Sequence, residues 1–467
     1  TAENLAMDGV RRPESALALA PATIGWLVIR LCEAARWYKY DGRSKDYVEI
    51  DAPGEVARDL IEDSDQLPFP PLRAISRHPL VRDDGTLADQ PGYDQPTRLL
   101  FDFDASRFPS IPAYPSQADA QAAASTLGDL LRNFPFVGDE DRAVALAAFL
   151  TALQRPILPA APMVCFDAPV PGSGKSLLAH AAAILATGDT APMASIGNTA
   201  EETEKRLDGA LLAGDPVLVL DNVEQAVGGE KLCSLLSEPT VRVRRLGGSD
   251  LVSVPSTAAV LATGNNLKIK GDVARRAIIC RLDPGVERPE LRRFDQDLLA
   301  EVRERRGELV AACLTIGRAY HVAGQPRVAN MAIGGYGAWD AAVRSPLMHA
   351  GEADPVATME RLRTADPVLA TLREVLTAFD DKFATSKTAK EIANAAQDDE
   401  NLRDALLPVA GNHNGTINTR RIGGYLAKHS DRIVDGLQLR NVGTRQHAQL
   451  WQVQRVDSQT EGVNDYD

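Results

Sequence analysis

The chain has 467 residues, of which 44% are hydrophobic and 25% are charged. These values exclude a disordered chain, and the length leaves room for roughly three or four domains of ordinary size. The net charge of -13 argues against a surface that is basic throughout. No apolar run is long enough to span a bilayer and no secretory leader is evident, so we expect no membrane contact.

The first 115 residues predict a small α+β module, because short apolar runs are separated by proline and Asp-Gly turns. The expected elements are helices near residues 23–38 and 53–61 and short strands near residues 79–87 and 98–104. Ser116 is a typical N-cap for a helix that reaches residue 132, and another helix is expected over 139–153. We assign residues 116–160 to a helical linker.

A glycine-rich turn follows the first strongly apolar strand, in residues 162–176 (PMVCFDAPVPGSGKS). A strand, a glycine-rich loop and an apolar helix in this order are typical of a phosphate-binding loop, whose backbone N–H groups surround phosphate oxygens. The usual pattern opens with a glycine, and here Pro169 takes that position. The residues predicted to bind a nucleoside triphosphate are Pro171, Gly172, Ser173, Gly174, Lys175, Ser176 and Leu177.

The loop also carries side chains suited to a phosphate-bound metal. Lys175 is expected to reach the outer phosphates and the Ser176 hydroxyl to bind Mg²⁺. A second Mg²⁺ ligand is expected at the end of a neighbouring strand, and residues 216–222 (PVLVLDN) form a short apolar run that reaches Asp221. The sequence therefore predicts a Mg²⁺ site at Ser176 and Asp221.

The residue that activates the attacking water is left open between two candidates. Asn222 directly follows Asp221, where a carboxylate would serve as general base. Asn222 could orient the water without accepting its proton, or the nearby Glu224 could take the role of base.

The third apolar strand ends in two asparagines, in residues 256–266 (STAAVLATGNN). An amide at a strand end beside the phosphates can hydrogen-bond the attacking water or the γ-phosphate. We prefer Asn266 for this role, with Asn265 as the second choice. The alternative is a simple turn, since asparagine tolerates the left-handed backbone conformation.

An arginine pair precedes the fourth apolar run, residues 277–282. A guanidinium of Arg275 or Arg276 is expected to reach the γ-phosphate bound by a neighbouring subunit, as an arginine finger supplied in trans. The alternative is a solvated pair at the start of a strand.

A basic hairpin is predicted between the second and third strands, where VRVRRLG and LVSVPS alternate apolar and polar residues around a Gly-Gly-Ser-Asp turn. Arg242 and Arg244 share one face, Arg245 lies near the tip, and Lys268 and Lys270 follow the third strand. We expect these cations to bind nucleic-acid phosphates without sequence preference. The alternative is an ordinary hairpin with solvated arginines.

The C-terminal part predicts a long charged helix over residues 294–324, a connector over 296–365 and a winged helix over 366–458, followed by a disordered tail over 459–467. The winged helix is expected from helices at 367–379, 386–396, 402–409 and 419–429 and from strands at 432–439 and 450–456. Arg420 and Arg421 open the helix that would enter the major groove of DNA. A protein contact is the alternative use of such a module.

The five cysteines lie in apolar segments without the spacing of a zinc site. We expect free thiols and a cytoplasmic location.

The order of these motifs resembles superfamily 3 helicases, most closely the ATPase module of phage, plasmid and poxvirus-type primase-helicases. The similarity is strongest from about residue 162 to 294, where it rests on the glycine-rich loop, the LDN and TGNN strand ends, the hairpin and the GDVARR segment. It extends more weakly to the N-terminal and C-terminal regions. The resemblance implies an α/β fold with an AAA+ P-loop ATPase core over 161–295, an N-terminal α+β module, a helical collar over 116–160 and a C-terminal winged helix.

The resemblance also implies an ATP hydrolase that acts as a replicative DNA helicase of a mobile element. A homo-hexameric ring would thread single-stranded DNA through a pore lined by the hairpin, so single-stranded and forked DNA are the expected partners. Because the chain begins at Thr1 without a methionine, a primase fused upstream, or a separate one, is a further expected partner. The alternative is a DNA-binding ATPase switch, an origin-recognition or loader protein that does not unwind DNA.

Overall fold

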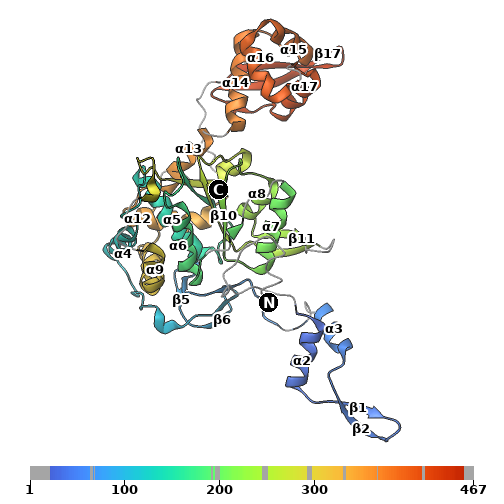
Figure 1. The fold of residues 1–467 in the computed structure, drawn as a ribbon, viewed down its shortest axis with the longest axis vertical. Helices are drawn as coiled ribbons and strands as arrows, with labels where there is room; N and C mark the ends of the chain where they lie inside the picture. The colour runs from blue at the N-terminus through green and yellow to red at the C-terminus, as the bar shows by residue number, and fades with distance from the viewer. Residues whose placement is uncertain are drawn as a thin grey trace. The chain divides into compact units, whose positions relative to one another are not determined.

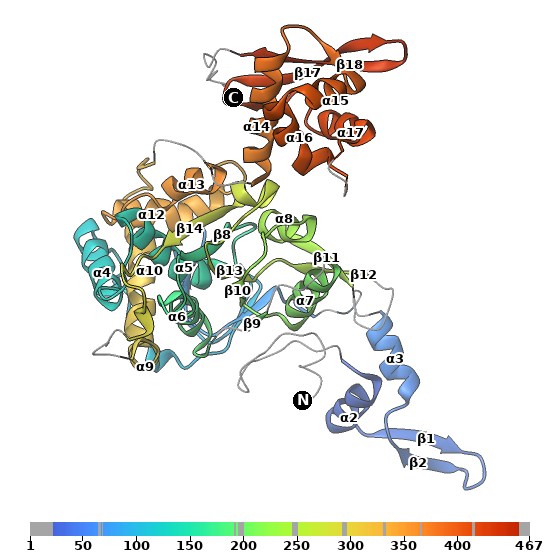
Figure 2. The same ribbon diagram turned by 45° about the horizontal axis from the view of Figure 1, so that its top comes forward.

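The structure is a computed structural model (Figures 1 and 2). The structure describes residues 22–63, 67, 69–190, 193–194, 200–244, 251–291, 297–329, 333–364, 367–412 and 416–456. The chain forms two compact units: one comprises residues up to 225 with 229–267 and 276–358, the other 226–228, 268–275 and 359 onward. Within the described ranges, no helix combines the length and apolar character needed to cross a membrane.

The N-terminal segment consists of α2 (Ile24–Ala34), β1 (Trp37–Asp41), β2 (Asp46–Ile50) and α3 (Gly54–Glu62). The Thr23 hydroxyl accepts a hydrogen bond from the backbone N of Trp26 (3.2 Å) and so starts α2. The helix expected over residues 23–38 was predicted too long. The chain leaves the helix after Ala34 because the aromatic residues that follow pair with β2 as an antiparallel hairpin.

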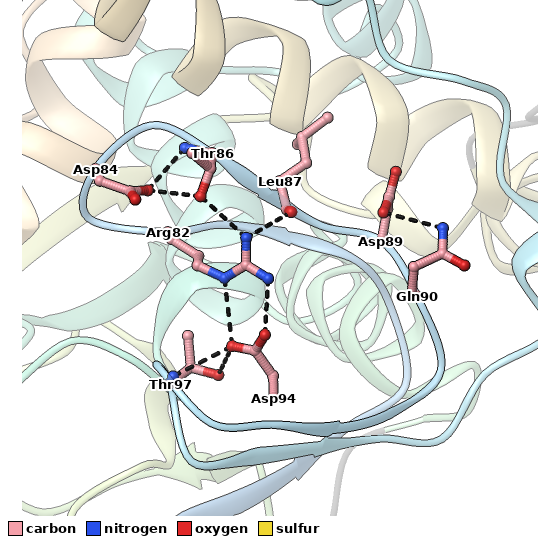
Figure 3. Close-up of polar contacts among 8 residues, drawn as sticks. All are labelled: Arg82, Asp84, Thr86, Leu87, Asp89, Gln90, Asp94 and Thr97. Atoms are coloured by element: carbon pink, nitrogen blue, oxygen red, sulfur yellow. Dashed lines mark hydrogen bonds and ion pairs between the residues drawn. The ribbon is translucent and has the colours of Figure 1, made fainter.

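Five short strands follow: β3 (Ala74–Ser76), β4 (Leu80–Val81), β5 (Leu87–Ala88), β6 (Gly92–Asp94) and β7 (Leu99–Phe101). Figure 3 shows the polar network that joins their turns. The Arg82 guanidinium pairs with Asp94 (Nη2–Oδ1 2.7 Å) and donates to Thr86 Oγ1 (2.9 Å) and to the Leu87 carbonyl (2.7 Å). These groups satisfy one another, so the network holds the turns together.

Two helices lead to the central sheet. α4 (Gln117–Leu130) starts at Ser116 as predicted, with a capping box in which the Ser116 hydroxyl and Asp119 carboxylate accept each other's backbone N–H groups. α5 (Asp139–Gln154) is buried on almost every side, as its run of alanine and leucine suggests.

A five-stranded parallel sheet forms the centre of the first unit, with strands β8 (Met163–Ala168), β9 (Met193–Ala194), β10 (Val217–Val223), β13 (Ala259–Asn265) and β14 (Ala277–Arg281). Their order is β14-β8-β13-β10-β9, and each neighbouring pair is parallel. The mixed α/β fold is therefore consistent with a P-loop core. Because β13 lies between β8 and β10, the carboxyl ends of these three strands are neighbours.

The other helices of this unit are α6 (Lys175–Thr187), α7 (Ala200–Ala213), α8 (Glu230–Ser237), α9 (Leu298–Glu304) and α10 (Arg306–Val322), with short turns η2 (Ala105–Arg107) and η4 (Pro289–Leu291). The turn η3 (Gly271–Arg276) belongs to the second unit up to Arg275. The helix expected over residues 294–324 is two helices that meet at Arg305. The Arg306 guanidinium donates to the carbonyls of Ile184 (2.9 Å), Leu185 (3.0 Å) and Ala186 (3.2 Å). It thereby satisfies the free carbonyls at the end of α6.

The predicted hairpin is present as β11 (Thr240–Arg244) paired antiparallel with β12 (Leu251–Pro255). Beyond α10 come α11 (Gly337–Trp339), the π-helical turn η5 (Asp340–Arg344), α12 (Ser345–His349) and the turn η6 (Pro355–Thr358). Trp339 is fully buried and its indole N–H donates to Thr151 Oγ1 (2.8 Å), while buried Arg344 binds Asp354 with two nitrogens. This segment packs against the sheet domain.

The second unit contains α13 (Met359–Thr364), α14 (Pro367–Lys382), β15 (Lys387–Thr388), α15 (Ala389–Asp398), α16 (Glu400–Ala410), α17 (Thr419–Lys428), β16 (Ile433–Val434), β17 (Leu437–Arg445) and β18 (Ala448–Arg455). The strands form one antiparallel sheet in the order β15-β18-β17-β16. The helices and the sheet enclose a separate core around Phe379, Leu426 and Trp451.

Candidate functional site

The loop between β8 and α6 turns at two glycines. Gly172 has a φ of 75° and Gly174 a φ of 99°, values at which glycine avoids the steric cost of a side chain. The Ser173 hydroxyl donates to the Val170 carbonyl (2.7 Å) and closes the turn. Pro169 is not among the residues with positive φ, so a proline fits the position where glycine is usual.

Lys175 and Ser176 are the first two residues of α6, so the unpaired N–H groups of the helix N-terminus adjoin the loop. The Lys175 side chain is largely buried, and its Nζ donates to Asn265 Oδ1 (2.8 Å) and to the Val170 carbonyl (3.1 Å). Burial lowers the pKa of Lys175, while the carboxylates of Asp167 and Asp221 act in the opposite direction. The two groups that accept hydrogen bonds from Nζ, the Val170 carbonyl and the Asn265 amide oxygen, are neutral. The positive charge of Lys175 can therefore pair with an anion.

Asp221 is held at the end of β10 by hydroxyl groups. Ser176 Oγ (3.1 Å) and Thr263 Oγ1 (2.7 Å) both donate to Asp221 Oδ1. Thr263 Oγ1 also accepts from the backbone N of Asn222 (3.0 Å). The predicted pair Ser176 and Asp221 is thus brought together by the phosphate-loop helix and the neighbouring strand.

The two asparagines at the end of β13 differ in their contacts. The Asn265 side chain accepts from Lys175. The Asn266 backbone N donates to the Ala168 carbonyl (3.0 Å), and its side-chain amide lies 3.5 Å from the Pro169 carbonyl oxygen. Both asparagines are exposed, but only Asn265, the second choice from the sequence, contacts the loop lysine, whereas the Asn266 amide lies beside the loop backbone.

A cavity of about 530 Å³ adjoins these residues. One part of its lining is polar and is formed by Lys175, Ser176, Asp221, Thr263 and Asn265. Another part is largely apolar and includes Leu130, Phe134, Pro135 and Leu298. The cavity thus offers one wall to phosphates and another to an apolar ring system.

Phe134 is a residue of the site that the sequence did not reveal. A Cβ added to Gly174 would lie 2.7 Å from Phe134 Cε1, so the ring packs directly on the glycine. The contact joins residues forty positions apart in the chain, and no local pattern marks it. Asn133, Asp297 and Glu301, which also line the cavity, were likewise not predicted.

The two candidates for the water-activating residue differ in position. Asn222 lines the cavity and has a φ of 48°. Glu224 is exposed and is not among the described residues that line the cavity.

The two arginines proposed as fingers differ in exposure. Arg275 has a side chain that is 66% exposed and pairs with Asp272 (2.5 Å). Arg276 is partly buried, and its guanidinium bonds the Ser237 hydroxyl at the end of α8. Arg275 is therefore the more accessible of the two.

The hairpin β11–β12 has one buried and one exposed face, as its alternation predicted. Val241 and Val243 are buried, and Arg242 and Arg244 are exposed on the opposite face. Arg245 and the tip lie outside the described residues. Lys268 and Lys270 are exposed and belong to the second unit.

Arg420 and Arg421 lie in the first turn of α17 and are both exposed. The Arg421 guanidinium donates to the Gly411 carbonyl (2.8 Å). Nucleic-acid binding by any of these cations stays a prediction.

The Ser176 hydroxyl and the Asp221 carboxylate are oxygen donors of the kind that Mg²⁺ prefers. In the part of the chain that the structure describes, no group of three or more His, Cys, Asp or Glu side chains could hold a metal.

No protein-family model matches the chain, and no curated protein matches it. Among solved structures, the fold is similar to the apo structure of the NrS-1 C-terminal region (TM-score 0.36, 11% identity), a match that covers 92% of this chain and 99% of that one. It is also similar to an inhibitor-bound JCV helicase (TM-score 0.23, 14% identity), over 49% of this chain and 66% of that one. Similarities of this size carry no functional argument.

Proposed function

We propose that the cavity beside Lys175 binds and hydrolyses a nucleoside triphosphate, ATP. The observation that carries the proposal is the meeting of Lys175, Ser176, Asp221 and Asn265 at one cavity. The polar wall would take the triphosphate, with Lys175 on the outer phosphates and backbone N–H groups of the loop around them. The apolar wall at Phe134 would take the base.

Ser176 and Asp221 would hold Mg²⁺, which would neutralise the negative charge that develops on the phosphates. The remaining roles fall to the chain itself. Asn265 would orient the attacking water or the γ-phosphate, in preference to Asn266, because its side chain already contacts Lys175. Asn222, which lines the cavity, would orient the attacking water. Glu224 would have to turn toward the cavity to act as the general base.

We further propose that the active form is an AAA+ ring, a homo-hexamer of the superfamily 3 type, in which Arg275 reaches the phosphates bound by the next subunit. Its exposure supports this choice over Arg276, whose guanidinium is engaged at Ser237. A surface pair such as Arg275 with Asp272 costs little to break, so the guanidinium is free to change partner.

The mechanical output would be translocation on single-stranded DNA and unwinding of forked DNA. Exposed Arg242 and Arg244 on one face of the hairpin support a contact with the phosphate backbone. The same nucleotide site would serve a DNA-binding switch that does not unwind, and no described feature favours that alternative. A primase, fused or separate, would supply the primers for replication.

The test is substitution of the loop lysine. Lys175→Ala should abolish ATP hydrolysis and unwinding of a forked duplex, since the γ-phosphate loses its cation, while the thermal unfolding temperature stays close to that of the unsubstituted chain. Lys205→Ala on the exposed side of α7 is the matched control and should retain both activities. Unwinding by the Lys175→Ala protein would remove the assignment, and hydrolysis without unwinding in the unsubstituted chain would favour the switch.

A further inference from the structure

We propose that the second unit is a winged-helix module that binds duplex DNA of the B form, with α17 in the major groove and the β17–β18 hairpin as the wing. The proposal does not depend on the nucleotide site. It rests on the charge, exposure and pairing of a few side chains within this unit and on one glycine.

Basic residues outnumber acidic ones at the C-terminal end of the unit. From residue 416 to 456 the basic residues are Arg420, Arg421, Lys428, Arg432, Arg440, Arg445 and Arg455, and the acidic residues are Asp431 and Asp435. This excess is local, because the whole chain carries a net charge of -13. A stretch with an excess of basic residues in an acidic protein is complementary to a polyanion.

The structure separates cations with a structural partner from cations without one. Arg421 donates to the Gly411 carbonyl, Arg445 pairs with Glu391 (2.5 Å) and Arg455 pairs with Asp380 (2.9 Å). Arg420 and Lys428 are exposed, and neither has an ion pair with any described residue. They lie eight positions apart on α17, so both point from the same face of the helix.

Gly424 lies between these two cations on the same face. A Cβ added at Gly424 would meet no atom within 4 Å, so nothing in the unit requires a glycine there. Glycine inside a helix is less stable than alanine, and here no packing contact explains the loss. An open glycine between two cations lets the helix backbone approach a groove closely.

The hairpin β17–β18 has the form of a wing. Residues 440–449 are exposed, and Figure 2 shows the hairpin projecting beyond the helices of the unit. Gln446 (φ 49°) and His447 (φ 67°) form the tight two-residue turn at its tip, which matches the twist of the strands. The pairing of β15 with β18 (Lys387 opposite Trp451, Thr388 opposite Leu450) anchors the base of the hairpin in the unit.

The helix favours DNA over RNA as the duplex. The major groove of B-form DNA is about 12 Å wide and admits an α-helix, whereas the major groove of A-form RNA is too narrow for side chains to read. We therefore expect the unit to bind a DNA duplex and to bind an RNA duplex of the same sequence much more weakly.

The test is binding of the full chain, without nucleotide, to a blunt DNA duplex of about two helical turns, measured by fluorescence anisotropy over a range of salt. The double variant Arg420→Ala, Lys428→Ala should weaken binding about tenfold or more and lower the slope of log affinity against log salt by about 1.8, since two phosphate contacts are lost. Arg58→Ala, which removes an exposed cation on α3 outside this unit, is the control and should change neither quantity.

A second variant tests the groove itself. Gly424→Leu adds a good helix former in open space, so the unfolding temperature should not fall, yet duplex affinity should drop at least about tenfold because the side chain blocks the approach. Equal binding of DNA and RNA duplexes, an effect of Arg58→Ala as large as that of the double variant, or unchanged affinity in both α17 variants would each overturn the proposal.

Discussion

Two strand ends at the site are built in the same way at the level of single residues. Asn222 (φ 48°) follows Asp221, and Asn266 (φ 50°) follows Asn265. Non-glycine residues seldom adopt this left-handed conformation, and asparagine does so at the least cost. In both places the residue with the left-handed conformation directly follows the side chain that makes the contact. Asp221 thus lies beside Ser176, and Asn265 lies beside Lys175.

This geometry gives a prediction that separates the two neighbouring amides. Asn265→Ala should lower kcat for ATP hydrolysis about 10²-fold, the usual loss when one aligned donor of a polar site is removed. Asn266→Gly removes the other amide and keeps the positive φ without strain, so kcat should stay within about twofold. Steady-state hydrolysis at saturating ATP measures both.

The thermal unfolding temperature of both variants serves as the control for folding. A large loss of kcat in Asn266→Gly with full activity in Asn265→Ala would restore the first choice made from the sequence and contradict the assignment to Asn265.

At the scale of elements, the alternating pattern of the hairpin β11–β12 gives it one buried face and one exposed face. Val241 and Val243 are buried, so the ribbon is fixed to the domain through one face. Arg242 and Arg244 lie on the other face, which is exposed. Substitutions on the exposed face are therefore expected to leave folding intact.

The double variant Arg242→Ala, Arg244→Ala should bind single-stranded DNA less tightly and should lose most of the stimulation of ATP hydrolysis by single-stranded DNA. The slope of log affinity against log salt should fall by about 1.4, or about 0.7 for each lost contact with a single strand. Binding titrations at several salt concentrations and hydrolysis assays with and without DNA measure these effects. Ser253→Ala, opposite Arg242 on β12, is the control without charge loss; an unaltered salt slope in the double variant would contradict the role of the hairpin.

Elements with a strong local signal could be predicted from the sequence. The apolar runs of β8, β10, β13 and β14 and the capping box at Ser116 lie where the pattern places them. The β1–β2 hairpin was missed because its aromatic residues continue the apolar pattern of α2. The break at Arg305 was missed because the charged helices on either side have similar composition.

At the scale of the whole molecule, the site depends on contacts that no local pattern carries. The insertion of β13 between β8 and β10 decides that an amide lies beside the loop lysine. The packing of Phe134 on Gly174 is equally a product of the tertiary fold. The sequence could therefore predict which residues form the phosphate site, but not which of the two asparagines enters it or what forms the apolar wall.

The proposed assembly predicts that two inactive variants restore each other. Lys175→Ala removes the phosphate contact of its own subunit but keeps Arg275. Arg275→Ala keeps the loop but removes the finger, which should lower hydrolysis about 10³-fold or more. In a mixed ring, an interface that pairs the intact loop of one variant with the intact Arg275 of the other is complete, so hydrolysis should return on mixing.

Hydrolysis rates of each variant alone, of the mixture, and of Lys175→Ala mixed with the double variant Lys175→Ala, Arg275→Ala provide the comparison. The last mixture contains no complete interface and should stay inactive. Arg275 is mostly exposed, and among the described residues its ion pair is with Asp272 on the surface, so its loss should not destabilise the fold and reduced activity can be assigned to the interface. The mixture of Lys175→Ala and Arg275→Ala should be tested under conditions where subunits exchange. If it is no more active than the two variants alone, each subunit completes its own site and the proposed role of Arg275 between subunits is contradicted.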